Sequence, residues 1–355
     1  MEAYIRGIAN ISPQPTFNIG PFLEDIREYH TARLLAVAPD YKDYLQPNQL
    51  RRMCRHLKMG VTAAGMCLHD AGVEKPDAII TGTGLGMMEE TEKFLGNLLD
   101  NNETLLNPTA FIQSTHNTVG AHIAVMLGCN NYNLTYVHGP VSLENALLDS
   151  LMWLEEKPSA NVLLGGVEEI SEVYFDITNG MGFWKKSGIS NLDLRKDKTP
   201  GTIAGEGASF FLLSKEASPQ NYCQIRGLST RYNPEKQDIA VEHIESFLAA
   251  HNLSPDDIDL VILGYNGDPE TDAFYEPVAR YFDGKAVKTW FKHLCGEHYV
   301  ASSFALWMAA RILKSQVVPP IIRLDNQQKP GRIGNILIFN HHKNIHHSLM
   351  LVSSC

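Results

Sequence analysis

The chain has 355 residues, of which 44% are hydrophobic and 20% are charged, and it carries a formal net charge of −10. This composition is typical of a globular protein with a large buried core. The excess of acidic groups disfavours binding to nucleic acid, whose phosphates would repel it. The sequence also argues against a membrane span, because the apolar run Val317 to Ile322 is short and is broken by two prolines.

The cysteines and the basic residues indicate the compartment and the kinds of site that the protein contains. The six cysteines are dispersed, with no CxxC pair and no signal peptide before them, which disfavours a disulfide framework and a zinc site and indicates a reducing cytoplasm. One basic cluster stands out, and a solvated helix face is its favoured interpretation. The alternative is a docking site for an acidic partner protein. The cluster consists of Arg51, Arg52, Arg55 and Lys58.

The first part of the chain alternates β-type runs with helical patterns. A long helix is predicted from Leu50 to Ala71, with Gly72 as its stop, and further helices begin near Met87, Asn117 and Ser142. The glycine run GTGLG lacks the lysine-serine ending of a P-loop, so we interpret it as a turn between a strand and a helix. The predicted strands are Tyr4 to Ile11, Ala78 to Thr83, Leu134 to Val137, Asn161 to Gly166 and Ala204 to Leu213.

The second part repeats this alternation after a linker at Glu216 to Asn221. We therefore expect two halves, residues 1–216 and 217–355, each a predominantly parallel sheet covered by helices. The predicted strands are Cys223 to Tyr232, Leu260 to Tyr265, Ala286 to Phe291, Ile336 to Phe339 and Leu349 to Val352. The predicted helices are Asp238 to Asn252, Asp272 to Phe282 and Tyr299 to Gln316.

The stretch Asn133 to Leu147 organises the rest of the chain. A run of β-branched and aromatic residues predicts a buried strand, and Ser142 opens a helix whose apolar face includes Leu143, Ala146 and Leu147. The start of a helix stabilises a thiolate or an oxyanion, because its first N–H groups have no partner within the helix. The turn itself offers Gly139, Pro140 and Val141 but no cysteine.

Three segments together resemble the β-ketoacyl synthase family of the thiolase superfamily. They are this central stretch, Asn107 to Gly128 before it and Ala160 to Ser171 after it. The AGEGASFFLL run resembles the family's GEGA strand. The resemblance implies an α/β fold of five layers, αβαβα, built from two pseudo-repeated halves with mostly parallel mixed sheets. It also implies an acyl-accepting cysteine at the turn, and that position falls on Pro140.

The other functional positions implied by the resemblance are altered as well. The first catalytic histidine of the family falls on Asn266. The K-x-x-x-G-H segment keeps Lys292, whereas its histidine becomes Glu297. The glycine-rich gate loop near the C-terminus is replaced by NHHKN, which places Asn340, His341 and His342 at the gate.

These changes predict a loss of condensing activity. Decarboxylative condensation needs a thiolate to hold the acyl chain and two imidazoles to bind the thioester oxygen. Pro140 cannot accept an acyl group, and an anionic Glu297 would repel both malonate and its enolate. The resemblance then implies a non-condensing partner that acts with acyl carrier protein, like a chain-length factor. It is strongest to the short ketosynthase-like proteins of bacterial aryl-polyene and flexirubin-type pigment clusters.

The resemblance also implies a dimer. In the family, the strand that begins here at Asn133 pairs across a two-fold axis, with a second copy or with an active ketosynthase. Its apolar, uncharged sequence in this chain fits an interface strand. No cofactor is implied.

Two hypotheses of other classes remain open. In the first, Ser142 or Cys295 takes an acyl group with His138 or His298 as base, which gives an acyltransferase or a hydrolase. The simpler interpretation of Ser142 is an N-cap.

In the second, a histidine-rich turn binds a metal ion. If strands flank the turn, His341 shares a face with His347, and His342 with His346. Exposed histidine runs are more often solvated, so this hypothesis is not favoured. The neighbouring carboxyl groups of Glu168 and Glu169 are interpreted as structural.

Overall fold

The computed structural model describes residues 1–355 except 18, 19, 21, 105, 107, 187, 234–238 and 328–330. Asn107, where one of the family-like segments begins, and Asp238, the expected start of a helix, therefore lie outside the described residues. Among the described residues, no helix has both the length and the apolar character needed to cross a membrane.

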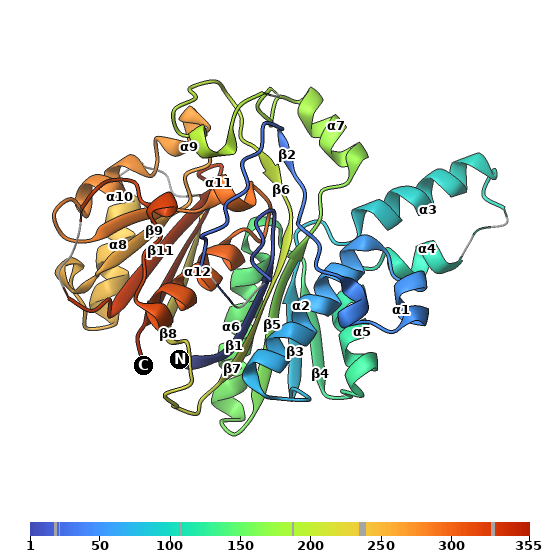
Figure 1. Ribbon diagram of the computed structural model, residues 1–355, viewed down its shortest axis with the longest axis horizontal. Helices are drawn as coiled ribbons and strands as arrows, with labels where there is room; N and C mark the ends of the chain where they lie inside the picture. The colour runs from blue at the N-terminus through green and yellow to red at the C-terminus, as the bar shows by residue number, and fades with distance from the viewer. Residues whose placement is uncertain are drawn as a thin grey trace.

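Ten of the strands form one large sheet in the order β10-β9-β11-β12-β8-β1-β7-β5-β3-β4, and β2 and β6 form a small parallel pair (Figure 1). The strands are β1 (Ala3–Ile11), β2 (Arg33–Leu34), β3 (Ala78–Gly82), β4 (Tyr132–Tyr136), β5 (Asn161–Glu168), β6 (Ala204–Gly205), β7 (Gly207–Ser214), β8 (Cys223–Tyr232), β9 (Leu260–Leu263), β10 (Val287–Trp290), β11 (Asn335–His342) and β12 (His346–Ser353).

Helices cover both faces of this sheet and the space between its two halves. They are α1 (Pro47–Arg52), α2 (Arg55–Ala71), α3 (Met88–Asp100), α4 (Pro108–Gln113), α5 (Thr118–Leu127), α6 (Ser142–Glu156), α7 (Glu172–Gly180), α8 (Ile239–Ala250), α9 (Pro269–Asp272), α10 (Glu276–Tyr281), α11 (Lys292–Cys295) and α12 (Ser302–Ser315).

The sheet consists of two halves with the same topology. In the first half, β1, β7 and β5 are joined by antiparallel pairings, and β5, β3 and β4 by parallel ones. In the second half, β8, β12, β11, β9 and β10 follow the same sequence of pairings. The halves meet where β1 pairs antiparallel with β8. The parallel pairings thus lie in the outer strands of each half, and the proposed boundary at residue 216 lies between β7 and β8.

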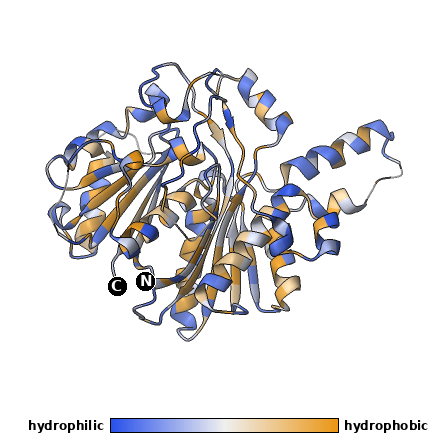
Figure 2. Ribbon diagram, in the orientation of Figure 1, coloured by the Kyte–Doolittle hydropathy of each residue, from blue (hydrophilic) through white to orange (hydrophobic). Residues whose placement is uncertain are grey.

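Three hydrophobic cores lie between the five layers, and the middle core contacts both halves of the sheet. The middle core packs α6 and α12 between strands of both halves, with Leu143, Ala146, Leu147 and Leu151 buried as expected. One outer core packs α2 and α5 against the first half, and the other packs α8 and α10 against the second. Figure 2 shows the same division, with hydrophobic strands inside and polar residues on the outer turns of the helices. This is the expected αβαβα arrangement, because a sheet buried on both faces needs a helical layer on each side.

The predicted long helix from Leu50 is divided in two. Met53 and Cys54 have extended backbones (ψ 134° and 171°) that separate α1 from α2. The break buries Met53 and points Arg55 toward the buried carboxylate of Glu206. The prediction of one continuous helix was wrong. No glycine or proline marks the break in the sequence, and a contact with the distant residue Glu206 accompanies it instead.

The predicted burial of the strand Leu134 to Val137 was also wrong. β4 is the edge strand of the first half, and Leu134 and Val137 are 37% and 45% exposed. An apolar sequence is equally compatible with a core strand and with an exposed edge strand. The prediction Ala204 to Leu213 is likewise split into β6 and β7 around Glu206, and Asp272 to Phe282 into α9 and α10.

Candidate active site

A cavity of about 390 Å³ opens between the two halves of the fold. It lies where β5, β9 and β11 end, the edge at which open α/β sheets commonly bind ligands. The first half supplies residues that follow β5 and α7, and the second half supplies the turns after β9, α11 and β11. Asn266, Glu297 and His342, three of the positions derived from the sequence, line this cavity.

Asn266, Lys292 and Glu297 form one hydrogen-bonded group. The Lys292 ammonium donates to Glu297 Oε1 at 3.0 Å and to Oε2 at 2.8 Å. Asn266 Nδ2 donates to Glu297 Oε2 at 2.8 Å. All three side chains are buried, at 8% exposure or less. Burial favours a higher pKa for Glu297, but the charge of Lys292 and the hydrogen bonds from Lys292 and Asn266 lower it below its usual value, so this side chain is a carboxylate.

The backbone fixes this group in place. Asn266 Oδ1 accepts hydrogen bonds from the backbone N–H of Asp268 and from the Thr271 hydroxyl, while the Asn266 N–H donates to Asp272. The backbone N–H of Glu297 donates to Ile203 O, and the carbonyl oxygen of Glu297 accepts from the N–H of Gly205. A Cβ on Gly205 would lie 1.9 Å from the carbonyl oxygen of Cys295, which explains the glycine at this position. The amide of Asn266 therefore donates to the carboxylate instead of pointing freely into the cavity.

The two histidines nearest to this group are uncharged. Burial lowers the pKa of His298 and of His342 to about 4, despite the nearby carboxylate of Glu297. Both line the cavity, and His342 lies 5.3 Å from the Tyr299 ring, centroid to centroid. Neutral imidazoles here can accept a proton or a hydrogen bond, but they add no positive charge to the site.

Pro140 and Ser142 lie at the start of α6 and do not line the cavity. Pro140 belongs to a short 3₁₀ turn, Gly139–Val141. The Ser142 hydroxyl is fully buried, accepts from the N–H of His138 at 2.8 Å and donates to Gly139 O at 2.8 Å. The N-cap position is occupied by Val141, so the prediction of Ser142 as the N-cap was wrong: its hydroxyl closes the preceding turn instead. The His138 ring bonds to Asn145 at 2.8 Å and not to Ser142.

Cys295, the other candidate nucleophile, is also outside the cavity lining. Its thiol is buried and donates to Gly296 O at 3.3 Å. Burial raises the pKa of this thiol above its ordinary value, and the nearby Lys292 opposes this only in part. A thiolate is therefore disfavoured at the position where covalent catalysis would need one.

The gate residues form the hairpin between β11 and β12. His341 pairs with His347 and His342 with His346, which confirms the shared faces predicted from the sequence. His341 stacks on Tyr275 at 4.1 Å between ring centroids, and Asn340 Oδ1 accepts from the Tyr275 hydroxyl. Because the two pairs face opposite sides of the hairpin, the four imidazoles cannot meet at one ion. The described part of the chain contains no group of three or more His, Cys, Asp or Glu side chains placed to hold a metal.

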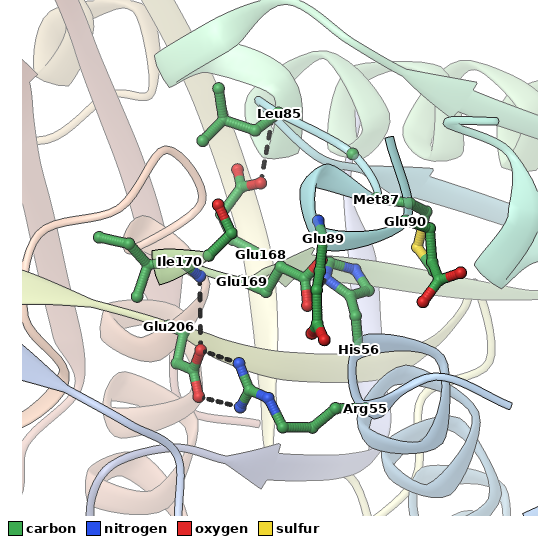
Figure 3. Close-up of polar contacts among 12 residues, drawn as sticks. Arg55, His56, Leu85, Met87, Glu89, Glu90, Glu168, Glu169, Ile170 and Glu206 are labelled. Atoms are coloured by element: carbon green, nitrogen blue, oxygen red, sulfur yellow. Dashed lines mark hydrogen bonds and ion pairs between the residues drawn. The ribbon is translucent and has the colours of Figure 1, made fainter. Parts of the chain in front are cut away.

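Three buried carboxyl groups, those of Glu168, Glu169 and Glu206, lie at or beside the wall of the cavity (Figure 3). Glu168 accepts hydrogen bonds from Gly84 N, Leu85 N and the Thr83 hydroxyl. Burial nevertheless raises the pKa of Glu168 to about 8 and that of Glu169 to about 7. Both carboxyl groups line the cavity, so their interpretation as purely structural leaves out their position at its wall.

Figure 3 also shows Arg55 pointing inward to form a two-pronged ion pair with Glu206, which is fully buried. The sequence interpretation of Arg55 as part of a solvated basic face was therefore incomplete, because its side chain is 38% exposed but its guanidinium is bound to a buried carboxylate. The break between α1 and α2, which the sequence pattern does not reveal, directs this side chain toward Glu206.

Stability should fall as the pH rises, because Glu168 has a raised pKa. Below the pKa of an unfolded glutamate, about 4.3, both states are protonated. Between that value and about 8, the folded chain holds a proton that the unfolded chain has lost. We expect Glu168→Gln to flatten the decline in urea-unfolding free energy between pH 5.5 and 8 by on the order of 1 kcal/mol per pH unit. The exposed Glu156→Gln is the control, and equal slopes in both variants would contradict the assignment.

The fold is that of the thiolase-like ketosynthases. No protein-family model matches the sequence, and no curated protein matches it significantly. Solved structures match it over 100% of this chain and 99% of theirs. One is described as the ishigamide ketosynthase/chain length factor (TM-score 0.81, 17% identity). Another is a type II polyketide synthase acyl-carrier protein in complex with its ketosynthase (0.74, 15%), and a third is a β-ketoacyl synthase from Burkholderia phymatum STM815 (0.75, 15%).

Proposed function

We propose that this protein is a ketosynthase-like subunit that does not itself condense acyl chains. One observation carries the proposal: the group formed by Asn266, Lys292 and Glu297 satisfies its own hydrogen bonds and presents a carboxylate. A condensing site needs donors that are free to bind a thioester oxygen and no negative charge beside the leaving carboxylate. Pro140 adds the second obstacle, because it offers no nucleophile.

The proposed role is that of a chain-length-factor-like partner in fatty-acid or polyketide assembly, of the aryl-polyene type, in the cytoplasm. Acyl carrier protein is the proposed carrier of the chain. The solved structures of similar fold, whose descriptions include a carrier-protein complex and a chain length factor, support this role. The six cysteines, all within the described residues, are free thiols, which fits a reducing compartment.

The edge strand β4 is the proposed interface with an active ketosynthase or with a second copy. An edge strand has unpaired backbone groups, and this one carries exposed apolar side chains. Neighbouring helices extend the apolar surface on both sides. The exposed apolar residues of β4, the residue after it, α5 and α6 are Tyr132, Leu134, Val137, Val125, Met126, Leu148 and Met152.

The proposal is tested with the purified chain and with malonyl- and acyl-charged carrier protein. Intact mass should show no acyl adduct, and carbon dioxide release should stay at the level of carrier protein alone. An active ketosynthase in a parallel tube provides the positive control. An adduct, or release well above background, would contradict the proposal and direct attention to Ser142 and Cys295.

The same preparation tests the interface. Light scattering should give a particle of two subunits, either two copies of the 39.5 kDa chain or one copy with a ketosynthase added in equal amount. A single-chain mass under both conditions would rule the proposed interface out.

A further inference from the structure

The cavity has an aromatic wall. Five rings line it, and they come from α7, the loop after α7, the turn after α9 and the segment before α12. These residues are Tyr174, Phe183, Trp184, Phe274 and Tyr299. The faces of such rings carry partial negative charge and attract cations.

Five carboxyl groups line the cavity. Glu168 and Glu169 have pKa values raised by burial to about 8 and about 7, so they add little full negative charge at pH 7. The carboxylate of Glu297 is bonded to Lys292, and Asp268 and Glu270 supply further acidic groups at the turn after β9. Of the described residues that line the cavity, Lys343 alone carries a fixed positive charge. An anionic ligand would meet repulsion beside Asp268 and Glu270.

Lys343 shows where a cation is held. It lies at the tip of the β11–β12 hairpin with a left-handed backbone (φ 49°), and its ammonium lies 3.5 Å from the centroid of the Phe183 ring. Burial lowers the pKa of Lys343 below its ordinary value, and the charges of Glu297 and Asp268 oppose this in part. The residue as a whole is exposed, so its side chain can leave without disturbing the core. The ammonium of Lys343 thus lies over an aromatic ring and near two carboxylates of the same chain.

We propose that this cavity binds a small organic cation, an ammonium group on an apolar chain, and that Lys343 is a tethered competitor which the ligand displaces. The ligand ammonium takes the place of the lysine over Phe183, near Asp268, and its apolar chain lies along the aromatic wall. This inference goes beyond the proposed function and does not depend on it, because it concerns what the cavity binds and not whether the chain acts beside a ketosynthase.

The test compares hexylammonium with hexanoate, two probes that share an apolar chain and differ in charge, by isothermal titration at pH 7. Hexylammonium should bind to the wild-type protein and hexanoate should not. Lys343→Met should tighten hexylammonium binding about three- to tenfold, because the internal competitor is gone. Asp268→Asn, which keeps a residue that can cap α9, should weaken it by a similar factor.

Lys285→Met is the matched control, because Lys285 lies over the Tyr281 ring at 4.4 Å but does not line the cavity. It should leave binding unchanged, and thermal melting should show that all three variants are folded. The proposal is overturned if hexanoate binds and loses affinity in Lys343→Met, which would make the lysine an anion site. It is also overturned if hexylammonium fails to bind both the wild-type protein and Lys343→Met, or if Lys343→Met does not tighten it.

Discussion

Replacing Lys292 with methionine is expected to lower the free energy of unfolding by about 3–5 kcal/mol. Lys292 and Glu297 are 1% and 8% exposed, and both carboxylate oxygens accept from the ammonium. Removal of the ammonium leaves a buried carboxylate with only the amide of Asn266 beside it. Urea unfolding followed by circular dichroism measures the loss.

The double variant Lys292→Met, Glu297→Leu should recover most of this loss, because an apolar pair leaves no uncompensated charge. Lys196→Met is the matched control: its ion pair with Asp193 has both side chains more than half exposed, and its removal should leave the unfolding curve unchanged. A loss below about 1 kcal/mol for Lys292→Met would show that water reaches the pair and that Glu297 is not held as a buried anion.

Restoring a cysteine at the family position is expected not to restore condensation. In Pro140→Cys, a thiol stands at the start of α6, where the helix favours a thiolate. Carbon dioxide release from malonyl-charged carrier protein should nevertheless remain at background, because neither Asn266 nor Glu297 supplies an imidazole and Asn266 still donates to Glu297 instead of a thioester oxygen. Release is measured beside an active ketosynthase, and the new thiol is verified by mass after alkylation.

The matched comparison is Pro140→Cys combined with Asn266→His and Glu297→His, which restores the family's cysteine and both of its histidines. Any gain in release should require the combined variant. If Pro140→Cys alone reaches the rate of the active ketosynthase, the missing cysteine was the only defect, and the residues Asn266 and Glu297 do not prevent condensation.

Local patterns in the sequence were sufficient for most of the architecture. Strands such as β3 and β5 are short, apolar and bounded by polar residues, so burial on both faces was predictable. Element ends were predicted less well where a distant side chain decides them. The break before Arg55 depends on Glu206, about 150 residues away in the sequence, and Glu206 also interrupts the strand predicted from Ala204 to Leu213.

The residues of the candidate site were predicted in part from the sequence, and their contacts were not. The resemblance to ketosynthases pointed to Asn266, Lys292 and Glu297, and the structure brings these three side chains together. The hydrogen bonds that join them could not be predicted, because they depend on the direction of each side chain. Phe183 and the other aromatic residues of the wall come from separate loops with no shared motif, so the pattern that unites them exists only in three dimensions.

The pairing of β1 with β8 and the shared middle core have one more consequence. Ala3, Tyr4 and Ile5 continue the hydrogen-bond ladder into the second half, while α6 from the first half and α12 from the second fill the same interior. If one half melted, it would strip the cover from the other and leave a row of open backbone groups at its border. The two halves therefore share a topology, but we do not expect either half to fold without the other. A boundary at residue 216 divides the chain in sequence and does not divide the sheet or the middle core.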